Sequence, residues 1–332
     1  MLENVAILGA GSWGTALGIV LAHRGTQVLA YSKRDQVAYD INENHRNDTY
    51  LPGVALPEGI RCTTRLEEIS NHDAILIAIP SKAARSVLEA VRDTGIPESS
   101  ILINCTKGMD PASGKLMHEL CAEIFPHNPF AVLSGPSHAE EAARGLATVV
   151  VAGSTDETVA VRVQDLFTVP WFRVYTSNDV VGIEVGGMVK NIFAVAAGAT
   201  DGLGLGDNAK AALLTRGLAE MTRIGIALGA KEETFRGLSG VGDLIATCYS
   251  KHSRNNRLGR MLGQGMTLEE AIAATNQVAE GVPNAKNVYA LSRKLGIRTP
   301  LIDQTYAVIH SKKPVMDALR ALFHRDPRPE AE

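Results

Sequence analysis

Short apolar runs rich in β-branched residues alternate with helix-length segments over the first half of the chain. The runs that we expect to be strands cover residues 5–8, 27–31, 74–79, 101–104, 131–133, 147–152 and 172–175. Strands separated by helix-length segments predict crossover connections and a mainly parallel sheet. The run at 74–79 is apolar at every position, as a strand covered by helices on both faces would be.

The pattern changes after about residue 178. Apolar positions there recur with helical spacing, without clear strands, in the segments 213–227, 268–274, 284–294 and 314–323. We therefore predict an α/β fold in two parts: a Rossmann-like, doubly wound domain over residues 1–178 and an all-helical C-terminal domain over residues 179–332. A chain of 332 residues is long for a single core, which also favours two domains.

Composition and charge argue against several classes of protein. With 45% hydrophobic and 21% charged residues the chain fits a soluble globular protein, and its net charge of −3 does not suit a broad nucleic-acid surface. The N-terminus lacks the basic start of a signal peptide, and no uninterrupted apolar run reaches membrane-spanning length. We expect a cytoplasmic protein without stable membrane insertion.

The four cysteines are Cys62, Cys105, Cys121 and Cys248. They show neither a C-x-x-C spacing nor a Cys/His cluster, so the sequence indicates no disulfide framework and no metal site. Reduced thiols in a cytosolic protein are the simpler interpretation.

A glycine-rich motif, Gly9-Ala10-Gly11-Ser12-Trp13-Gly14, directly follows the first predicted strand and opens an apolar helical segment. In this context the spacing predicts dinucleotide binding: Gly9 makes the tight turn, Gly11 lets a pyrophosphate approach, and Gly14 lets the helix pack closely on the strand. Ser12 and Trp13 would present backbone N–H groups to the pyrophosphate. The alternative is a tight turn that binds no ligand.

The end of the second predicted strand bears on the choice of nicotinamide cofactor. An enzyme that uses NAD is expected to carry Asp or Glu there, to accept from the ribose 2′-OH. Here the residues are Tyr31-Ser32-Lys33-Arg34, and Asp35 comes later. Two cations and a hydroxyl suit a 2′-phosphate, so NADP(H) is favoured. NAD(H) stays open through Asp35 or hydroxyl contacts, and a solvated loop is the alternative for the two cations.

One lysine, Lys190, lies in the segment 185–198, which is apolar around most of a helical circumference. Burial disfavours an ammonium group and can lower its pKa toward neutrality, where it can give or take a proton. Reduction of a ketone by hydride creates an alkoxide that needs a proton, so this lysine is a candidate acid. The alternative is a lysine that extends to solvent from a buried helix.

Two further segments follow predicted strands, at the carboxyl edge where open α/β sheets bind ligands. Lys107 comes after the strand at 101–104. Ser134-Gly135-Pro136-Ser137 ends the strand at 131–133, and we predict that a helix starts at Ser137. For Lys107 the alternative is a lysine in a surface turn.

A second anion site is indicated in the helical half. The stretch Gly-Leu-Ser-Gly-Val-Gly-Asp at 237–243 predicts a flexible turn that lets a ligand approach the backbone, and it ends in a carboxylate. Ser253-Arg254-Asn255 then opens a helix, so it offers free N–H groups and a guanidinium to a phosphate. The alternative is a loop between two helices whose charges face solvent.

Together these residues resemble the bacterial NAD(P)-dependent glycerol-3-phosphate dehydrogenase family, from the first glycine motif to beyond Glu280. The motifs that carry the resemblance lie at residues 9–17, 105–108, 134–137, 189–191, 202–210, 240–243 and 253–255. An ordered set of this kind is far more specific than any one motif. The resemblance implies reversible hydride transfer from NADPH or NADH to dihydroxyacetone phosphate, giving sn-glycerol 3-phosphate for phospholipid synthesis.

The same resemblance implies roles for single residues. Lys190 would be the proton donor and acceptor, with Asp243 beside it and Lys107 close to substrate and cofactor. The residues that would hold the substrate are Gly135, Ser137, Ser253, Arg254 and Asn255, the last three around its phosphate. Those implied at the cofactor are Tyr50, Ala139, Arg254, Val278 and Glu280. Position 33 departs slightly, because it carries Lys where Arg or His is expected in relatives, and Lys is not a bidentate fork.

Two other functions stay open. A β-hydroxyacid dehydrogenase also pairs a dinucleotide-binding domain with a helical domain that bears an active-site lysine, and it would bind a carboxylate at residues 253–255. A non-catalytic NADP(H) sensor would use the helical domain for a partner and would need no proton donor. The apolar helical half is also compatible with a homodimer.

Overall fold

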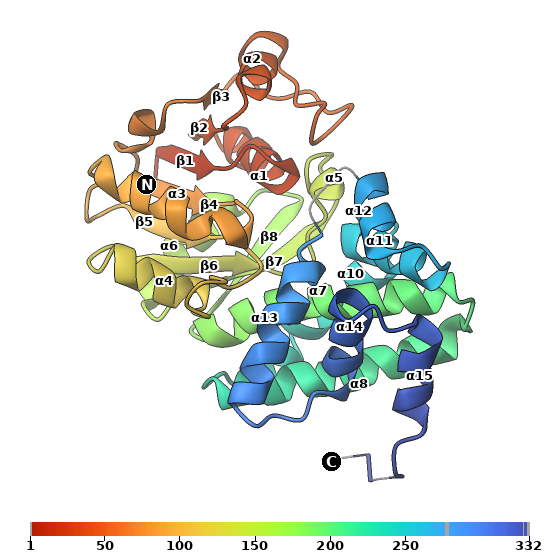
Figure 1. Ribbon diagram of the computed structural model, residues 1–332. Helices are drawn as coiled ribbons and strands as arrows, with labels where there is room; N and C mark the ends of the chain where they lie inside the picture. The colour runs from red at the N-terminus through yellow and green to blue at the C-terminus, as the bar shows by residue number, and fades with distance from the viewer. Residues whose placement is uncertain (1, 276–278, 328, 331–332) are drawn as a thin grey trace.

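The computed structural model describes residues 2–275, 279–327 and 329–330. Figure 1 shows an α/β part, drawn red to yellow-green, beside a helical part, drawn green to blue. One sheet has the strand order β3-β2-β1-β4-β5-β6-β7-β8. In chain order its strands are β1 (Asn4–Leu8), β2 (Gln27–Tyr31), β3 (Ile60–Thr63), β4 (Ala74–Ile77), β5 (Ile101–Asn104), β6 (Phe130–Ser134), β7 (Thr148–Gly153) and β8 (Phe172–Ser177).

Most neighbouring strands are parallel, as the alternation of apolar runs and helices predicts. All pairs from β3 to β6 are parallel, and so are β7 and β8. The exception is β7, which runs antiparallel to β6. The connection between these two strands contains only the short helix α5 (Ala139–Ala142), so the chain doubles back there instead of crossing over. The predicted Rossmann-like, mainly parallel sheet is confirmed, with this one antiparallel pair added.

Helices cover both faces of the sheet, because successive strand residues point to opposite sides. Ile7 faces the core that includes α1 and α6, whereas Ala6 faces the core that includes α3 and α4. The helical elements of this part are α1 (Ser12–His23), α2 (Asp35–Asn44), the 3-10 turn η1 (Leu66–Ile69), α3 (Ser81–Asp93), α4 (Met117–Ile124) and α6 (Glu157–Phe167).

β3 is missing from the sequence-based prediction. It pairs with β2 at the edge of the sheet, where Ile60 lies opposite Val28. The strand has only four residues, one of them the exposed Arg61, so no apolar run marks it in the sequence. The predicted strand at 74–79 is also shorter in the structure, because β4 ends at Ile77.

The strand order reverses at β1, whose neighbours are β2 on one side and β4 on the other. The connections that leave β1 and β4 therefore run to opposite faces of the sheet and leave a crevice at the carboxyl ends of these strands. This crevice is where a ligand is expected in an open α/β sheet.

The helical part is built around α7, against which α8, α10, α11 and α13 pack (Figure 1). Its elements are α7 (Val180–Gly202), α8 (Gly206–Ala227), α9 (Glu232–Phe235), the π-helical turn η2 (Leu238–Gly242), α10 (Asp243–Tyr249), α11 (Arg254–Gly263), α12 (Leu268–Thr275), α13 (Gly281–Lys294), α14 (Pro300–His310) and α15 (Val315–Phe323). The four predicted helical segments coincide with α8, α12, α13 and α15, and the predicted helical C-terminal part is confirmed.

By length and composition α7 could cross a membrane, although Glu184 and Lys190 interrupt its apolar residues, so it is not an uninterrupted apolar run. Almost all of its residues are buried, however, because other helices surround it. A helix that is apolar around its whole circumference is typical of a protein core as well as of a membrane span.

Candidate active site

The turn from β1 into α1 is tight at two glycines and open at a third. Gly9 has φ +110°, and a Cβ there would lie 2.6 Å from the carbonyl oxygen of Ala78. A Cβ on Gly14 would lie 2.0 Å from the carbonyl oxygen of Gly9. Nothing lies within 4 Å of a Cβ on Gly11, the residue that precedes α1, and no side chain caps this helix. The first N–H groups of α1, including those of Ser12 and Trp13, thus have no capping side chain, and the space beside Gly11 is open, which suits a pyrophosphate.

Tyr50 and Arg34, both predicted to contact the cofactor, lie near this turn. The Ser12 hydroxyl donates to the backbone oxygen of Tyr50 at 2.6 Å, and the Arg34 guanidinium lies 5.5 Å from the centre of the Tyr50 ring. Lys33 and Arg34 are both exposed at the end of β2. Asn47, which sequence reasoning missed, donates to the backbone oxygen of Ala10 at 2.9 Å and holds the Tyr50 segment against the turn.

Asp243 lies between two lysines from different parts of the chain. Its Oδ1 is 2.5 Å from Nζ of Lys190 on α7, and its Oδ2 is 2.8 Å from Nζ of Lys107, which follows β5. Lys190 is 5% exposed and Asp243 is 1% exposed. The alternatives in which Lys190 extends to solvent and Lys107 occupies a surface turn are therefore wrong. Thr247, one turn after Asp243 on α10, accepts a hydrogen bond from Lys190 at 2.6 Å.

Burial sets the protonation of this group. It lowers the pKa of Lys190, Asp243 raises it again, and the positive charge of Lys107 lowers it, so that the pKa lies at about 7. Burial alone would raise the pKa of Asp243, but the two ammonium groups outweigh it and hold that pKa below its usual value. The result is an ionised carboxylate beside a lysine that can change protonation near neutral pH.

The loop after β6 contacts Lys107, and so lies beside Asp243 and Lys190. Lys107 donates from Nζ to the backbone oxygen of Gly135 at 3.2 Å, and the Ser137 hydroxyl donates to the same oxygen at 2.9 Å. The predicted helix start at Ser137 is wrong, because α5 begins at Ala139. Since its hydroxyl bonds back to Gly135, Ser137 stabilises the loop and does not cap a helix.

Ser253, Arg254 and Asn255 open α11, as predicted. The Ser253 hydroxyl accepts from the backbone N–H of Asn256 and so caps the helix, while Arg254 reaches solvent. Asn255 donates from Nδ2 to Oδ1 of Asn191 at 2.9 Å, and Asn191 directly follows Lys190. The start of α11 is thereby tied to the residue next to the buried lysine.

The flexible turn predicted at 237–243 is wrong, since residues 238–242 form the π-helical turn η2. Its glycines allow contact with other backbone segments. A Cβ on Gly240 would lie 2.2 Å from the backbone oxygen of Phe235, and one on Gly186 of α7 would lie 2.3 Å from that of Ser239. The close packing of η2 on α7, which brings Asp243 to Lys190, explains these glycines.

Of the other residues implied at the cofactor, Glu280 contacts the segment after β4, and Ala139 belongs to the helix α5, which packs on α1. The Ser81 hydroxyl, just after β4, donates to Oε2 of Glu280 at 3.1 Å, and α5 with the buried Ala139 packs against α1. Burial raises the pKa of Glu280, which the Ser81 bond and the charge of Arg254 oppose. Val278 lies outside the described residues.

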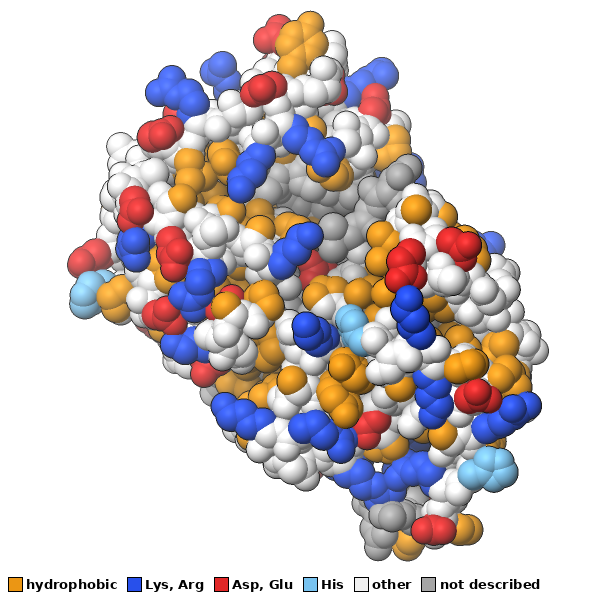
Figure 2. Space-filling model, in the orientation of Figure 1, with side chains coloured by type: hydrophobic (Ala, Val, Ile, Leu, Met, Phe, Trp, Pro, Cys, Tyr) orange, Lys and Arg blue, Asp and Glu red, His pale blue; other side chains and the backbone are white. Residues whose placement is uncertain are grey.

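Figure 2 shows that the surface is hollowed between the α/β part and the helical part, and Lys and Arg side chains border this hollow. The arrangement joins a dinucleotide-type turn to a buried lysine whose pKa is near neutrality. A family model described as the NAD-dependent glycerol-3-phosphate dehydrogenase N-terminus matches residues 4–160, and the corresponding C-terminus model matches residues 179–320. The chain belongs to this family.

Individual members of the glycerol-3-phosphate dehydrogenase family are similar over the whole length. The glycerol-3-phosphate dehydrogenase (NAD(P)+) of Pediococcus pentosaceus is 45% identical, with 100% of each chain covered. That of Moorella thermoacetica is also 45% identical, covering 100% of this chain and 99% of its own. The crystal structure of glycerol-3-phosphate dehydrogenase from Coxiella burnetii has a TM-score of 0.93 at 38% identity, with 98% of this chain and 99% of that chain covered. These findings favour this family over the β-hydroxyacid dehydrogenases.

The sequence analysis gives no role to three polar residues around Lys190 and Lys107. Asn191 belongs to the motif at 189–191, whereas Thr247 and Asn284 belong to none of the motifs. Asn284 on α13 donates from Nδ2 to the backbone oxygens of Lys107 at 3.0 Å and Met188 at 3.1 Å. The position of Thr247, four residues after Asp243 on one helix, is the signal that could have found it, because such residues share a helix face.

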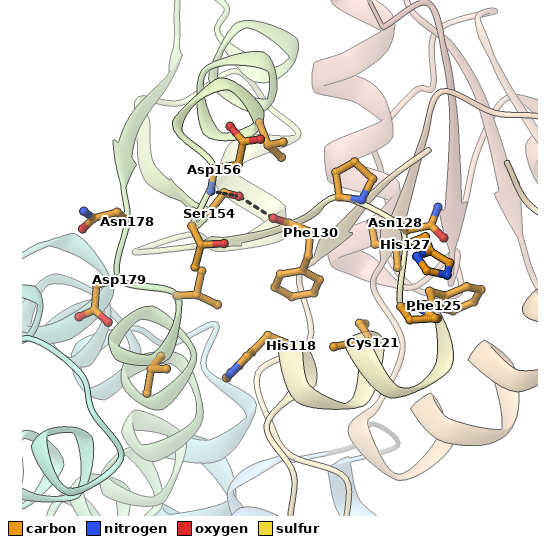
Figure 3. Close-up of a pocket in the computed structure, with 18 of the residues that line it drawn as sticks. His118, Cys121, Phe125, His127, Asn128, Phe130, Ser154, Asp156, Asn178 and Asp179 are labelled. Atoms are coloured by element: carbon orange, nitrogen blue, oxygen red, sulfur yellow. Dashed lines mark hydrogen bonds between the residues drawn. The ribbon is translucent and has the colours of Figure 1, made fainter. Parts of the chain in front are cut away.

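A cleft of about 570 Å³ lies apart from this site, beside α4 and the N-terminus of α7 (Figure 3). None of the described candidate site residues lines it. Several polar groups in it already have partners: Asp156 caps α6, Asp179 caps α7, and Lys231 donates to Asn178 at 2.8 Å. Figure 3 shows the Ser154 hydroxyl similarly engaged, with the backbone of Phe130 and Asp156.

Proposed function

We propose that the protein catalyses reversible hydride transfer between NAD(P)H and C2 of dihydroxyacetone phosphate, giving sn-glycerol 3-phosphate. The observation that carries this proposal is the buried Lys190, whose pKa is about 7 and whose Nζ lies 2.5 Å from Asp243. The family membership and the Asn255–Asn191 contact, which ties a candidate phosphate site to this lysine, support it. A sensor would need no such proton donor.

The chain's residues fit a dinucleotide. Gly11, Ser12 and Trp13 would hold the pyrophosphate, because the space beside Gly11 is open and no side chain caps the first N–H groups of α1. Lys33 and Arg34 would bind a 2′-phosphate, so NADP(H) is the favoured cofactor and NAD(H) the alternative. Tyr50, Ala139, Lys107, Arg254, Val278 and Glu280 complete the proposed cofactor contacts. The bound nicotinamide supplies or accepts the hydride.

Protonated Lys190 donates the proton that the nascent alkoxide oxygen needs, and neutral Lys190 accepts it in the reverse direction. Asp243 holds the lysine in place, and Lys107 adds positive charge near the oxygen on which negative charge develops. After each reduction Lys190 regains a proton from solvent. The buried position keeps competing water away from this exchange.

Ser253, Arg254 and Asn255 would bind the substrate phosphate through side chains and the free N–H groups of α11, while Gly135 and Ser137 line the rest of the substrate. A guanidinium and a helix N-terminus are both suited to a phosphate dianion. Binding the phosphate away from the reacting carbon holds the carbonyl in place for hydride attack.

We further infer the wider setting of the reaction. Residues 1–178 would form the dinucleotide-binding domain and residues 179–332 the substrate domain. This division falls in the short connection between the end of β8 and the start of α7. The product would serve phospholipid head-group synthesis, in the cytoplasm. The apolar helical half would support a homodimer.

The decisive experiment follows the absorbance of reduced nicotinamide when purified protein meets dihydroxyacetone phosphate and NADPH, or NADH in parallel. Rapid oxidation with the phosphorylated substrate and little with dihydroxyacetone is expected. Replacing Lys33 and Arg34 together by Ser should lower kcat/KM for NADPH more than for NADH. Oxidation of NADPH with a β-oxo acid instead, or NADPH binding without turnover, would overturn the proposal in favour of the β-hydroxyacid dehydrogenase or the sensor.

A further inference from the structure

The far end of α7 carries an ion pair, between the partly exposed Asp201 and the buried Lys210, that the proposed chemistry does not use. Oδ1 of Asp201, near the end of the helix, lies 2.6 Å from Nζ of Lys210, whose side chain is only 9% exposed. The Lys210 ammonium also lies 4.6 Å from the centre of the Tyr249 ring, at the end of α10. Removing two charges from water costs about as much as their attraction returns, so such a pair adds little net stability. A positional role is the better explanation.

Asn256 connects this pair to the start of α11. Its Nδ2 donates to Oδ2 of Asp201 at 3.2 Å and to the backbone oxygen of Cys248 at 2.9 Å. Its backbone N–H donates to the Ser253 hydroxyl at 3.2 Å. One residue therefore links the ends of α7 and α10 to the hydroxyl that caps α11.

Glycines let α11 lie directly on α7. A Cβ on Gly198 would lie 2.0 Å from the backbone oxygen of Asn256, and one on Gly259 would lie 1.9 Å from that of Val195. With no side chain between the two backbones at these points, α11 cannot slide along α7 without losing its contacts. Asp201 adds a polar tether to this apolar contact.

One helix, α7, thus carries both Lys190 and the residue to which the start of α11 is tied. Asp201 comes eleven residues after Lys190 on α7, which corresponds to roughly 16 Å along a helix axis. Asn255 ties α11 to the residue after Lys190, and Asn256 ties it to Asp201. Two tethers at two heights on one helix fix both the position and the direction of α11.

We propose that Asp201, held by Lys210, is a positioning residue that fixes the anion-binding turn 253–255 relative to Lys190 and so sets the preference for a phosphorylated substrate. This inference rests on the proposed function and deepens it. A looser turn binds phosphate less well, because its N–H groups and the Arg254 guanidinium no longer converge. The protonation of Lys190, which depends on burial, Asp243 and Lys107, stays unchanged.

The test compares Asp201→Asn and Asn256→Ala with Asp207→Asn, a control with the same chemical change at an exposed position in the first turn of α8. We expect KM for dihydroxyacetone phosphate to rise about tenfold in the first two variants, through the loss of hydrogen bonds that hold the turn. The inhibition constant of inorganic phosphate should rise by the same factor. The slow reduction of unphosphorylated dihydroxyacetone and the pH profile of kcat should stay as in the wild type, and the control should match the wild type throughout.

The inference would be overturned if, in both variants, KM for dihydroxyacetone phosphate and the inhibition constant of inorganic phosphate stay within about twofold of the wild-type values. An equal loss with unphosphorylated dihydroxyacetone would also overturn it, because general loosening of the site would then be the cause. If Asp201→Asn does not fold, Asn256→Ala decides, since it leaves the ion pair intact. If the wild type does not reduce dihydroxyacetone phosphate, the proposed function fails, and calorimetric binding of inorganic phosphate to the same variants still tests the positioning role.

Discussion

Lys190 and Asp243, which lie 53 residues apart in sequence, meet at 2.5 Å between Nζ and Oδ1, and both residues are almost completely buried. The contact joins α7 to the first residue of α10, and the π-helical turn η2 makes it by packing against Gly186. Burial and the carboxylate act on the lysine in opposite directions. The balance between them brings its pKa to about 7.

This balance predicts opposite pH dependences for the two directions of the reaction. Reduction needs protonated Lys190, so kcat should fall as pH rises through about 7, whereas kcat for oxidation should rise over the same range. Lys190→Met should lower kcat about 10²- to 10⁴-fold in both directions. Steady-state kinetics across pH checks this. A Lys190→Met enzyme with near-normal kcat at all pH values would show that another group moves the proton.

Asp243→Asn refines the same prediction. Because the Asp243 charge raises the pKa of Lys190, its removal should lower that pKa and move the kcat profile for reduction to lower pH. A profile that stays in place would mean that the carboxylate holds the lysine without tuning it.

A second prediction separates phosphate binding from proton transfer. Arg254→Met should lower kcat/KM for dihydroxyacetone phosphate by about a hundredfold, mainly through KM, because a charged hydrogen bond to phosphate is lost. Arg257→Met, one turn further along α11 at an exposed position, is the matched control and should have little effect. Equal losses in both variants would point to the general positive charge of the helix and not to a specific contact.

The third prediction concerns two glycines of the β1–α1 turn. Gly14→Ala places a methyl group 2.0 Å from the Gly9 oxygen, so it should lower the free energy of unfolding by at least about 2 kcal/mol. Gly11→Ala meets no atom within 4 Å and should leave stability unchanged. It fills the space proposed for the pyrophosphate, however, so the Kd for NADPH should rise at least about tenfold. Chemical denaturation and NADPH titration of both variants check the pair, and NADPH binding by Gly11→Ala at wild-type affinity would move the pyrophosphate elsewhere.

Local patterns were sufficient to predict most of the sheet and the burial of Lys190. The strand at 101–104 and the helix around Lys190 are each marked by their own apolar residues, so no knowledge of distant contacts is needed. β3 has no such mark, because its four residues gain their partners only from β2. The antiparallel β7 depends on the length of a connection, which the runs themselves do not specify.

The polar contacts of the site were harder to predict because they join distant segments. Asn191 and Asn255 are 64 residues apart, and Asn284 meets Lys107 across 177 residues. The glycines at 237–242 show a different limit. A sequence does not distinguish a glycine that lets a ligand approach from a glycine that lets another backbone segment approach. Here the backbone of the protein itself lies against these glycines.

The last prediction concerns a contact between the two parts of the protein. His118 on α4 lies 2.7 Å from Oε2 of the buried Glu184 on α7, measured from Nδ1. Burial lowers the pKa of His118, but the bond and charge of Glu184 outweigh it, so the pKa is raised above its value of 6.5 in the unfolded chain. A raised pKa means that the contribution to stability is complete below the unfolded pKa and is lost as pH rises through the folded pKa.

His118→Gln should therefore lower the free energy of unfolding by about 1–2 kcal/mol in mildly acidic buffer, and the difference from wild type should shrink as pH rises beyond neutrality. His127→Gln, at an exposed position bordering the same cleft, serves as the control and should show no such trend. Urea denaturation of the three proteins over a series of pH values measures the effect. A difference that is constant with pH would mean that His118 acts by packing alone, because an uncharged contact between α4 and α7 does not respond to protons.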